Sequence, residues 1–573
     1  MTSPTIPESP PAAAAVGSGG VLGKVAGLAL GTTLSRLTGF ARTSLLVAAL
    51  GAQLHADLFT IANTLPNMLY ILVAGGVFNT VLVPHLVRSM KNDHDGGQAY
   101  ASRVLTLAAV FLACVTLMLT LAVPVLLRVV VDDSYFGSAL TEQRESIVDL
   151  ARYCLPQVFF YGMFVVVGQI LNARGVFGPM MWAPIANNAI AIGVLGAYLF
   201  VYGPARGRQL WGAYTTGQEL LLGIGSTLGI AAQFLILLIY LRRTDIRYRP
   251  RFDLRGSGLG ATLRLAGWTV LFVLVNQLAY VLIVRLASAG AAMQAAQGAG
   301  GGAGYTVYSN AFLLIMVPHA IVTVSLATTI NPTLAAFGVD GDVRSLASHL
   351  TQAIKRVLSV IIPICAVLPV IAPVLADILW GYAGARDSLR PLAHTVALFS
   401  PGLALFTVHY LVLRGLFALE RHKTVFLVQC LIAASNVALA ATLTTAISNA
   451  AVAPLLAAAY SGAYLIGAAA SVRVLDLLVG GPEYRELGAF VMRILPLSAA
   501  VALAAFGVRA LVNVAGPLES GLVADKISAG VELLLVLLIG STVAVMAGRL
   551  LGIGEITGAA SAGTRLHRLV GRR

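Results

Sequence analysis

Residues 265–286 read LAGWTVLFVLVNQLAYVLIVRL, an apolar run that a single charge, Arg285, interrupts near its end. The hydrocarbon core of a bilayer is about 30 Å thick, and a helix of about 20 residues crosses it. Runs of this length follow one another from residue 21 to residue 551, about fourteen in all. The sequence therefore predicts an all-α polytopic membrane protein.

Composition excludes the soluble classes. The chain has 573 residues, of which 58% are hydrophobic and 11% charged, and its mean hydropathy is +0.86. Soluble domains carry about 25% charged residues, and the runs are too long and too uniformly apolar for strands of a membrane barrel. The net charge of +14 would suggest nucleic acid in a soluble protein. Here the cations crowd into short loops, as the positive-inside rule requires, so no nucleic-acid partner is predicted.

The apolar runs predict fourteen spans with kinks. Prolines inside several of them, such as Pro184 and Pro318, are typical of helices that surround a cavity in a transporter. The predicted spans are 22–50, 58–87, 103–131, 147–171, 178–202, 217–241, 260–288, 306–336, 347–376, 390–418, 423–447, 451–476, 486–513 and 526–549.

Loop charges set the orientation and the domain boundaries. The link 242–258 carries six arginines and the tail 552–573 is also basic, so both are expected in the cytoplasm, together with a disordered tail over 1–20. The link divides an N-terminal six-helix lobe, 21–241, from a second one, 259–478, and leaves two extra helices over 484–551. Between spans seven and eight, the Gly-rich stretch 291–304 predicts a flexible outer loop.

Charges within the first two spans mark a candidate site. Arg36 and Arg42 lie in the first span and Asp57 opens the second. A charge at mid-bilayer costs about 2.5–3.5 kcal/mol on insertion scales and usually faces a cavity or a partner. Gly39 could relax the helix and let both arginines reach one cavity, where guanidinium groups suit a diphosphate. An ion pair with Asp57, or snorkelling near the span ends, is an equally weighted alternative.

Other polar residues within the spans carry weaker signals. Asn276, Gln277 and Arg285 in span seven could line the same chamber, although each alone is more typical of contacts between helices. His85 and His409 are better explained as hydrogen-bonded structural histidines than as proton carriers. No protease, hydrolase or nucleotide-binding motif occurs, which argues against an enzyme.

Three stretches carry a resemblance to a known family. SRLTGFARTSLLVAALG (35–51), ADLFTIANTLPN (56–67) and LNARGVFGPMMWAPIANN (171–188) resemble signature stretches of the MurJ/MviN family, the lipid II flippases of peptidoglycan synthesis. The resemblance implies two six-helix lobes in a V around a central cavity, with a groove on the two extra helices for the undecaprenyl tail. It also agrees with a GC-rich bacterial source, which the excess of Arg over Lys indicates.

The resemblance also implies roles for particular residues. Arg36 and Arg42 match family arginines that bind the lipid II diphosphate, and Asp57 matches a family acidic residue. Two further family arginines are replaced, by Tyr70 and Ala311, so Arg285 is a candidate substitute, and Asn276 is a further predicted substrate-binding residue. Some relatives hold a sodium ion, for which Asn436 is the candidate ligand here.

Together these observations predict a flippase of the cytoplasmic membrane that moves lipid II outward by alternating access. No cofactor is expected, and with no ATPase motif an ion such as sodium or the membrane potential would drive the cycle. The expected partners are lipid II and membrane lipids around a monomer, with cell-wall synthesis proteins as a further option. The alternatives are an exporter of another polyprenyl-linked oligosaccharide or of drugs, and a non-transporting cell-wall scaffold.

Overall fold

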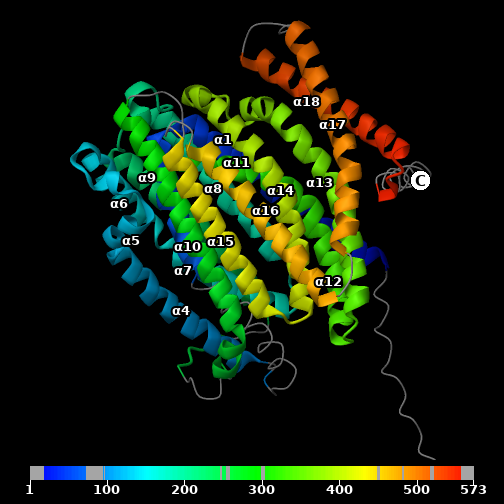
Figure 1. The fold of residues 1–573 in the computed structure, drawn as a ribbon. Coiled ribbons are helices and arrows are strands. Elements are labelled where there is room, and N and C mark those ends of the chain that lie inside the picture. The colour runs from blue at the N-terminus through cyan, green and yellow to red at the C-terminus, as the bar shows by residue number, and fades with distance from the viewer. Residues whose placement is uncertain are drawn as a thin grey trace, which may run out of the picture.

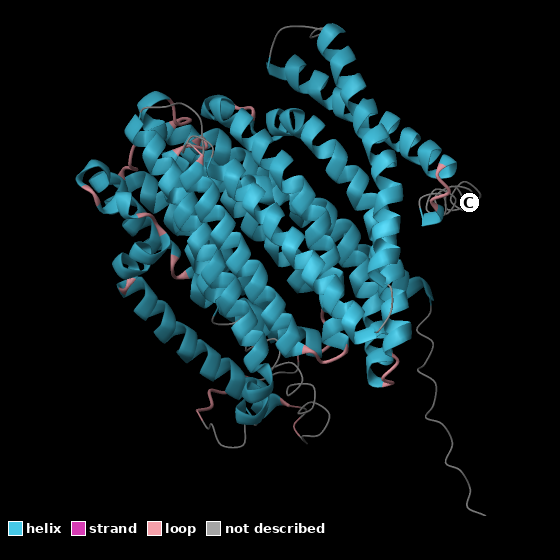
Figure 2. Ribbon diagram, in the orientation of Figure 1, coloured by secondary structure: helices cyan, strands magenta, loops and turns pink. Residues whose placement is uncertain are grey.

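The computed structural model describes residues 18–72, 95, 97–244, 248–252, 259–297, 304–447, 452–479, 483–515 and 522–555. Every regular element within these ranges is helical (Figure 2), as the sequence predicts. Twelve of the helices or broken helices are long and apolar enough to cross a membrane. Two more helices, α1 and α2, correspond to the first two predicted spans, and the second half of span two, with His85, lies outside the described residues.

The first lobe contains the helices before the basic link (Figure 1). Its helices are α1 (Ser18–Leu50), α2 (Leu54–Tyr70), α4 (Gln98–Leu121), α5 (Val123–Val130), α6 (Thr141–Cys154), α7 (Gln157–Ala173), α8 (Gly178–Tyr202) and α9 (Thr216–Arg242), with short 3-10 helices η3 (Asp133–Phe136), η4 (Ser138–Leu140) and η5 (Gly207–Trp211).

The second lobe and the extra pair follow. The second lobe has α10 (Leu259–Gln297), α11 (Tyr305–Pro318), a π-helical turn η6 (His319–Thr323), α12 (Val324–Val339), α13 (Val343–Trp380), η7 (Ala383–Ser388), α14 (Leu389–Ala418), α15 (His422–Ala446) and α16 (Val452–Val479). The extra pair is α17 (Glu483–Ala515) and α18 (Leu522–Leu550), which lies at one edge of the bundle and packs on α13 (Figure 1).

Proline breaks some spans and leaves others continuous. The helix breaks between α4 and α5 at Ala122, before Pro124, and between α6 and α7 at Leu155–Pro156. After Pro318 the chain widens into the π-helical turn. By contrast, α8 runs unbroken through Pro184. Proline removes one backbone N–H and its ring crowds the preceding turn, so these breaks have a local chemical cause.

The prediction of a flexible outer loop over 291–304 is partly wrong. Helix α10 continues to Gln297, and Ala291 and Ala292 are buried. The stretch AAMQAAQ consists of strong helix formers, and its beginning packs closely, since a Cβ atom on Gly290 would overlap Val452 of α16. Residues 298–303 lie outside the described ranges.

The two lobes meet at the end of the bundle that carries the turns 51–53, 131–140 and 304–305, which we call the outer end. Charge patterning predicts that this end faces away from the cytoplasm. There α2 packs against α10 and α11, the end of α1 against η7 and α13, and α5 and η3 against α10. The lobes are therefore closed against each other on the predicted outer side.

Candidate functional site

A polar cavity lies inside the first lobe, among α1, α2, α7, α8 and α9. Its volume is about 280 Å³. The Arg42 side chain lines it, and the structure gives this guanidinium no hydrogen bond or ion pair within the described part of the chain. The other polar lining residues are neutral: Asn63, Thr64, Asn67, Gln157, Tyr161, Asn187 and Ser226. The cavity thus has neutral hydrogen-bonding groups around one positive charge, that of Arg42.

The neutral lining residues were not singled out in the sequence. Asn63, Thr64 and Asn67 share a face of α2 at helical spacing, and that repeated amide pattern was the available signal. The Gln157 side-chain amide donates to Asn63 Oδ1 at 3.0 Å, which fixes α7 against α2. Amides both donate and accept hydrogen bonds, so this lining can replace the water around a polar headgroup.

Arg36 lies apart from Arg42. Helix α1 runs unbroken through Gly39, so the two arginines keep their different directions. Arg36 is exposed and is not among the residues that line the cavity, whereas Arg42 is half-buried. Asn188 of α8 holds α1 beside Arg36 by donating to Ser35 O at 2.9 Å and to Thr38 Oγ1 at 3.0 Å.

Asp57 joins the two lobes. Its carboxylate is fully buried and accepts the backbone N–H groups of Tyr305 at 2.8 Å and Thr306 at 2.7 Å. These are the first two residues of α11, so a side chain of the first lobe caps a helix of the second. A carboxylate at a helix N-terminus is stabilised by the unpaired N–H groups and the helix dipole. Among the described contacts Asp57 forms no ion pair with Arg36 or Arg42, so the structure does not support that alternative.

The replaced family arginine positions are filled by packed side chains. Tyr70 stacks on Tyr161, a lining residue of the cavity, with ring centroids 5.5 Å apart. Ala311 is fully buried in α11. Neither position adds a charge, so the first-lobe chamber keeps Arg42 as its charged lining residue.

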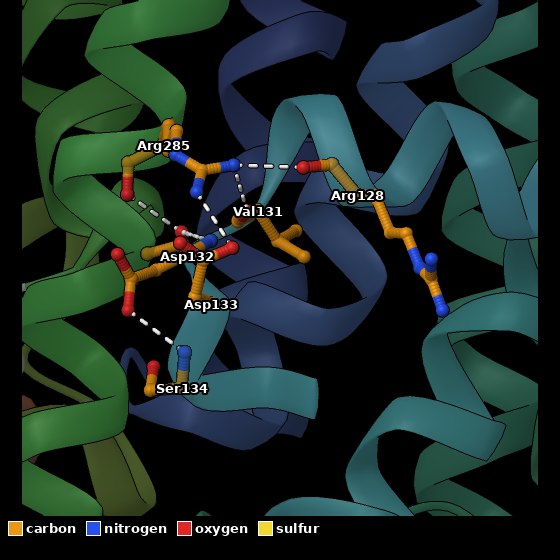
Figure 3. A network of polar contacts seen from close by, with 7 residues as sticks. Arg128, Val131, Asp132, Asp133, Ser134 and Arg285 are labelled. Carbon is orange, nitrogen blue, oxygen red and sulfur yellow. Dashed lines mark hydrogen bonds and ion pairs between the residues drawn. The ribbon is translucent and has the colours of Figure 1, made fainter. Parts of the chain in front are cut away.

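Arg285 binds the first lobe from α10 (Figure 3). Its guanidinium donates to the carbonyl oxygens of Arg128 at 2.7 Å and Val131 at 2.9 Å, and pairs with Asp133 at 2.8 Å. The Arg128 side chain points away from this cluster. In this conformation Arg285 therefore closes the outer end, and its predicted contact with substrate stays a prediction.

Replacing Arg285 with alanine should loosen the outer end more than replacing Asp133 with asparagine. Asp133 is 86% exposed, and exposed ion pairs contribute about 0–1 kcal/mol. The two carbonyl contacts are charge-assisted, and their loss should cost about 2 kcal/mol. Labelling of Ala292→Cys, a buried outer-end position, by a membrane-impermeant maleimide would measure the opening in a variant without the four native cysteines. Equal labelling of the two variants would contradict this assignment.

The remaining predicted site residues lie in the second lobe. Asn276 donates to Phe272 O at 2.8 Å and accepts from Gln429 at 2.8 Å, which joins α10 to α15. His409 is buried and hydrogen-bonded to Ser471 Oγ at 2.7 Å. Asn436 has a buried Oδ1 with no hydrogen-bond partner among the described residues. The described residues contain no cluster of three or more His, Cys, Asp or Glu side chains that could hold a metal ion.

These features define a class. The architecture is that of a polytopic transporter. It has two helical lobes closed at one end, a polar chamber with one charge, and an added helix pair. A family model described as "Lipid II flippase MurJ" matches residues 46–523. The chain belongs to this family.

Relatives and solved structures agree with this assignment. A "Probable lipid II flippase MurJ" of Rhizobium tropici is 26% identical over 416 residues, 72% of this chain and 74% of the relative. A "Lipid II flippase MurJ" of Burkholderia cenocepacia is 26% identical over 388 residues, 66% of this chain and 68% of the relative.

Among solved structures, "Lipid II flippase MurJ, inward closed conformation" superposes with a TM-score of 0.67 at 16% identity, over 91% of this chain and 99% of that one. An inward-facing multidrug resistance MATE family transporter reaches 0.62 at 16% identity, over 78% of this chain and 96% of that one. At this identity the likeness shows a shared fold. The MurJ structure superposes on a larger share of this chain than the MATE transporter does.

Proposed function

We propose that this chain moves lipid II from the inner to the outer leaflet of the cytoplasmic membrane by alternating access. Family membership supports the substrate. The proposed mechanism depends on one observation. The Arg42 guanidinium lines a cavity whose other polar groups are neutral, and it has no counter-ion among the described residues. A charge placed there is costly unless it has a partner, and an anionic diphosphate would supply one.

The physical task is to replace water around a charged headgroup. A diphosphate cannot enter about 30 Å of hydrocarbon without losing its hydration. Arg42 would pair with the diphosphate, while the amides of Asn63, Asn67 and Gln157 would donate hydrogen bonds to headgroup oxygens. The prenyl chain can stay in the lipid, so only the headgroup needs the protein.

The closed outer end supports a cycle with two states. In the described state the cap of Asp57 on α11 and the contacts of Arg285 hold the lobes together on the outer side. Release outward requires these contacts to break and equivalent ones to form at the cytoplasmic side. These polar contacts lie beside apolar packing of α2 against α10 and α11. A ligand shifts the balance between the two states by the difference between its binding free energies for them.

An ion gradient or the membrane potential would drive the cycle. The sequence has no nucleotide-binding motif, and a potential of 100 mV supplies about 2.3 kcal/mol per charge moved. The unpartnered Asn436 Oδ1 is the atom we propose as a ligand for a coupling cation such as sodium. We further propose that the protein acts as a monomer with both termini in the cytoplasm.

Depletion of the protein in its host tests the transport claim. Lipid II should accumulate in the inner leaflet, because the diphosphate headgroup does not cross unaided. The readout is the fraction of lipid II open to an externally added, membrane-impermeant probe. Normal outer-leaflet lipid II in a host without a second flippase would refute the proposal. Normal lipid II with defective transport of another oligosaccharide lipid would favour the exporter alternative.

A further inference from the structure

Helix α2 lies between the first-lobe cavity and the second lobe. One of its faces lines the cavity with Phe59, Asn63 and Asn67, which follow one another at four-residue spacing. The adjacent face forms hydrogen bonds with α10 and α11 of the second lobe. The residues of this second face recur at three- or four-residue spacing, and they are Asp57, Thr60, Thr64 and Met68. A movement of α2 therefore changes the cavity and the interlobe contact together.

Thr64 belongs to both faces of α2. Its side chain is a lining residue of the cavity. Its Oγ1 also accepts a hydrogen bond from the Tyr305 hydroxyl of α11 at 3.4 Å. The Thr64 hydroxyl itself donates to Thr60 O, one turn back in α2, at 2.7 Å. One side chain thus connects the cavity to a helix of the other lobe.

The Thr64 contact completes a chain of hydroxyl groups. The Tyr305 hydroxyl is also hydrogen-bonded to the Tyr280 hydroxyl of α10. Two tyrosine hydroxyls carry two protons but share one hydrogen bond, so the second proton needs a further acceptor. Among the described contacts Thr64 Oγ1 supplies that acceptor. Tyr305 is 1% exposed, and a buried donor without an acceptor is costly, so Thr64 stabilises the closed outer end.

The other hydrogen bonds of this face do not reach the cavity. Thr306 Oγ1 donates to Thr60 Oγ1 at 3.1 Å, and the Gln277 side-chain amide of α10 donates to Met68 O at 2.6 Å. Thr60, Met68 and Gln277 are not among the residues that line the cavity. Of these interlobe contacts, the one at Thr64 is therefore the one that a ligand in the cavity can alter directly.

We propose that Thr64 couples occupation of the cavity to opening of the outer end. This inference rests on the function proposed above, in which a diphosphate headgroup enters the cavity. A threonine in a helix has two accessible χ1 rotamers, and a hydroxyl group binds a diphosphate oxygen more strongly than a neutral acceptor. The Tyr305–Thr64 distance of 3.4 Å exceeds the usual value of about 2.7–2.8 Å, so this contact is weak and the headgroup displaces it.

The displacement favours separation of the lobes. When Thr64 turns to the headgroup, one proton of the Tyr280–Tyr305 pair has no acceptor in the closed state. In the open state water can accept it. The headgroup and the interlobe contact thus act on the same side chain, which is the physical requirement for coupling between two sites. The loss of one buried acceptor corresponds to about a 5-fold shift from the closed towards the open state.

The test uses the purified full chain in lipid nanodiscs, with lipid II as the ligand. The readout is maleimide labelling of Ala292→Cys in the background without the four native cysteines, since its rate follows the open population. Saturating lipid II, with occupancy measured by native mass spectrometry, should raise the labelling rate about 5-fold. Thr64→Val keeps the shape but has no hydroxyl. It should label faster without ligand and show no further response to lipid II.

Three variants separate coupling from a structural defect. Thr64→Ser keeps the hydroxyl and should restore the response to lipid II. Tyr305→Phe keeps the backbone N–H that Asp57 accepts and is not among the lining residues, so it should bind lipid II without the response. Tyr308→Phe, a buried tyrosine one turn further along α11, is the matched control and should respond as wild type.

The outcomes distinguish the coupling from the function on which it rests. An equal response to lipid II in Thr64→Val and wild type would overturn the coupling. An unchanged or lower labelling rate in the wild type with lipid II bound would also overturn it. Failure of the wild type to bind lipid II would instead refute the proposed function, and the coupling with it.

Discussion

Asp57→Ala should open the outer end and shift the protein away from the described conformation. The variant leaves two backbone N–H groups of α11, on Tyr305 and Thr306, without their acceptor in a buried site. Loss of an N-cap and of the associated charge–dipole interaction costs about 2 kcal/mol. That is about a 30-fold change in the balance between closed and open states. Maleimide labelling at Ala292→Cys should rise accordingly.

Two variants control this prediction. Asp57→Asn keeps one acceptor oxygen and should have a smaller effect. Gly304→Ala leaves the carboxylate in place but puts a methyl group where it would overlap Asp57 and Ala291, so it should act like Asp57→Ala. If Asp57→Ala and the wild type label at the same rate, the interlobe cap has no part in closing the outer end.

Arg42→Ala should strongly reduce transport while the protein still folds. The cavity would then have neutral polar groups only, and the diphosphate would lose its charged partner. Charge-assisted hydrogen bonds contribute about 1.5–3 kcal/mol, which corresponds to about a 10- to 150-fold loss in transport rate. Arg42→Lys keeps the charge but not the paired N–H donors, so it should retain only part of the activity.

Arg36→Ala and Asn63→Ala help to locate the effect of Arg42. Arg36 is not among the residues that line the cavity, so its replacement should lower transport less than that of Arg42. Asn63→Ala removes a neutral lining group and should raise the substrate concentration required for half-maximal transport. Full activity in Arg42→Lys would refute the bidentate contact.

Much of the fold was predictable because long apolar runs leave few choices in a membrane. Predicted spans such as 178–202 and 390–418 agree with α8 and α14 to within a residue. Proline effects were less predictable. Pro184 and Pro124 look alike in the sequence, but only the second lies at a break, so the local effect of proline does not by itself decide where a helix ends.

The sequence indicated which charged residues to consider for the candidate site, but not which residues they contact. Intramembrane charge identified Arg42 and Asp57 because each is costly in lipid. The partners of Asp57 are about 250 residues away in the sequence, and no local pattern indicates them. The same holds for Arg285, whose carbonyl partners depend on how α10 packs against α5.

The central claim is tested most directly by measuring lipid II on each leaflet while the native protein is depleted and a variant is supplied. We expect wild type to restore outer-leaflet lipid II, and Arg42→Ala, present at the same level in the membrane, to leave it in the inner leaflet. Restoration by Arg42→Ala at the wild-type rate would contradict the account, because the cavity charge would then have no role in transport.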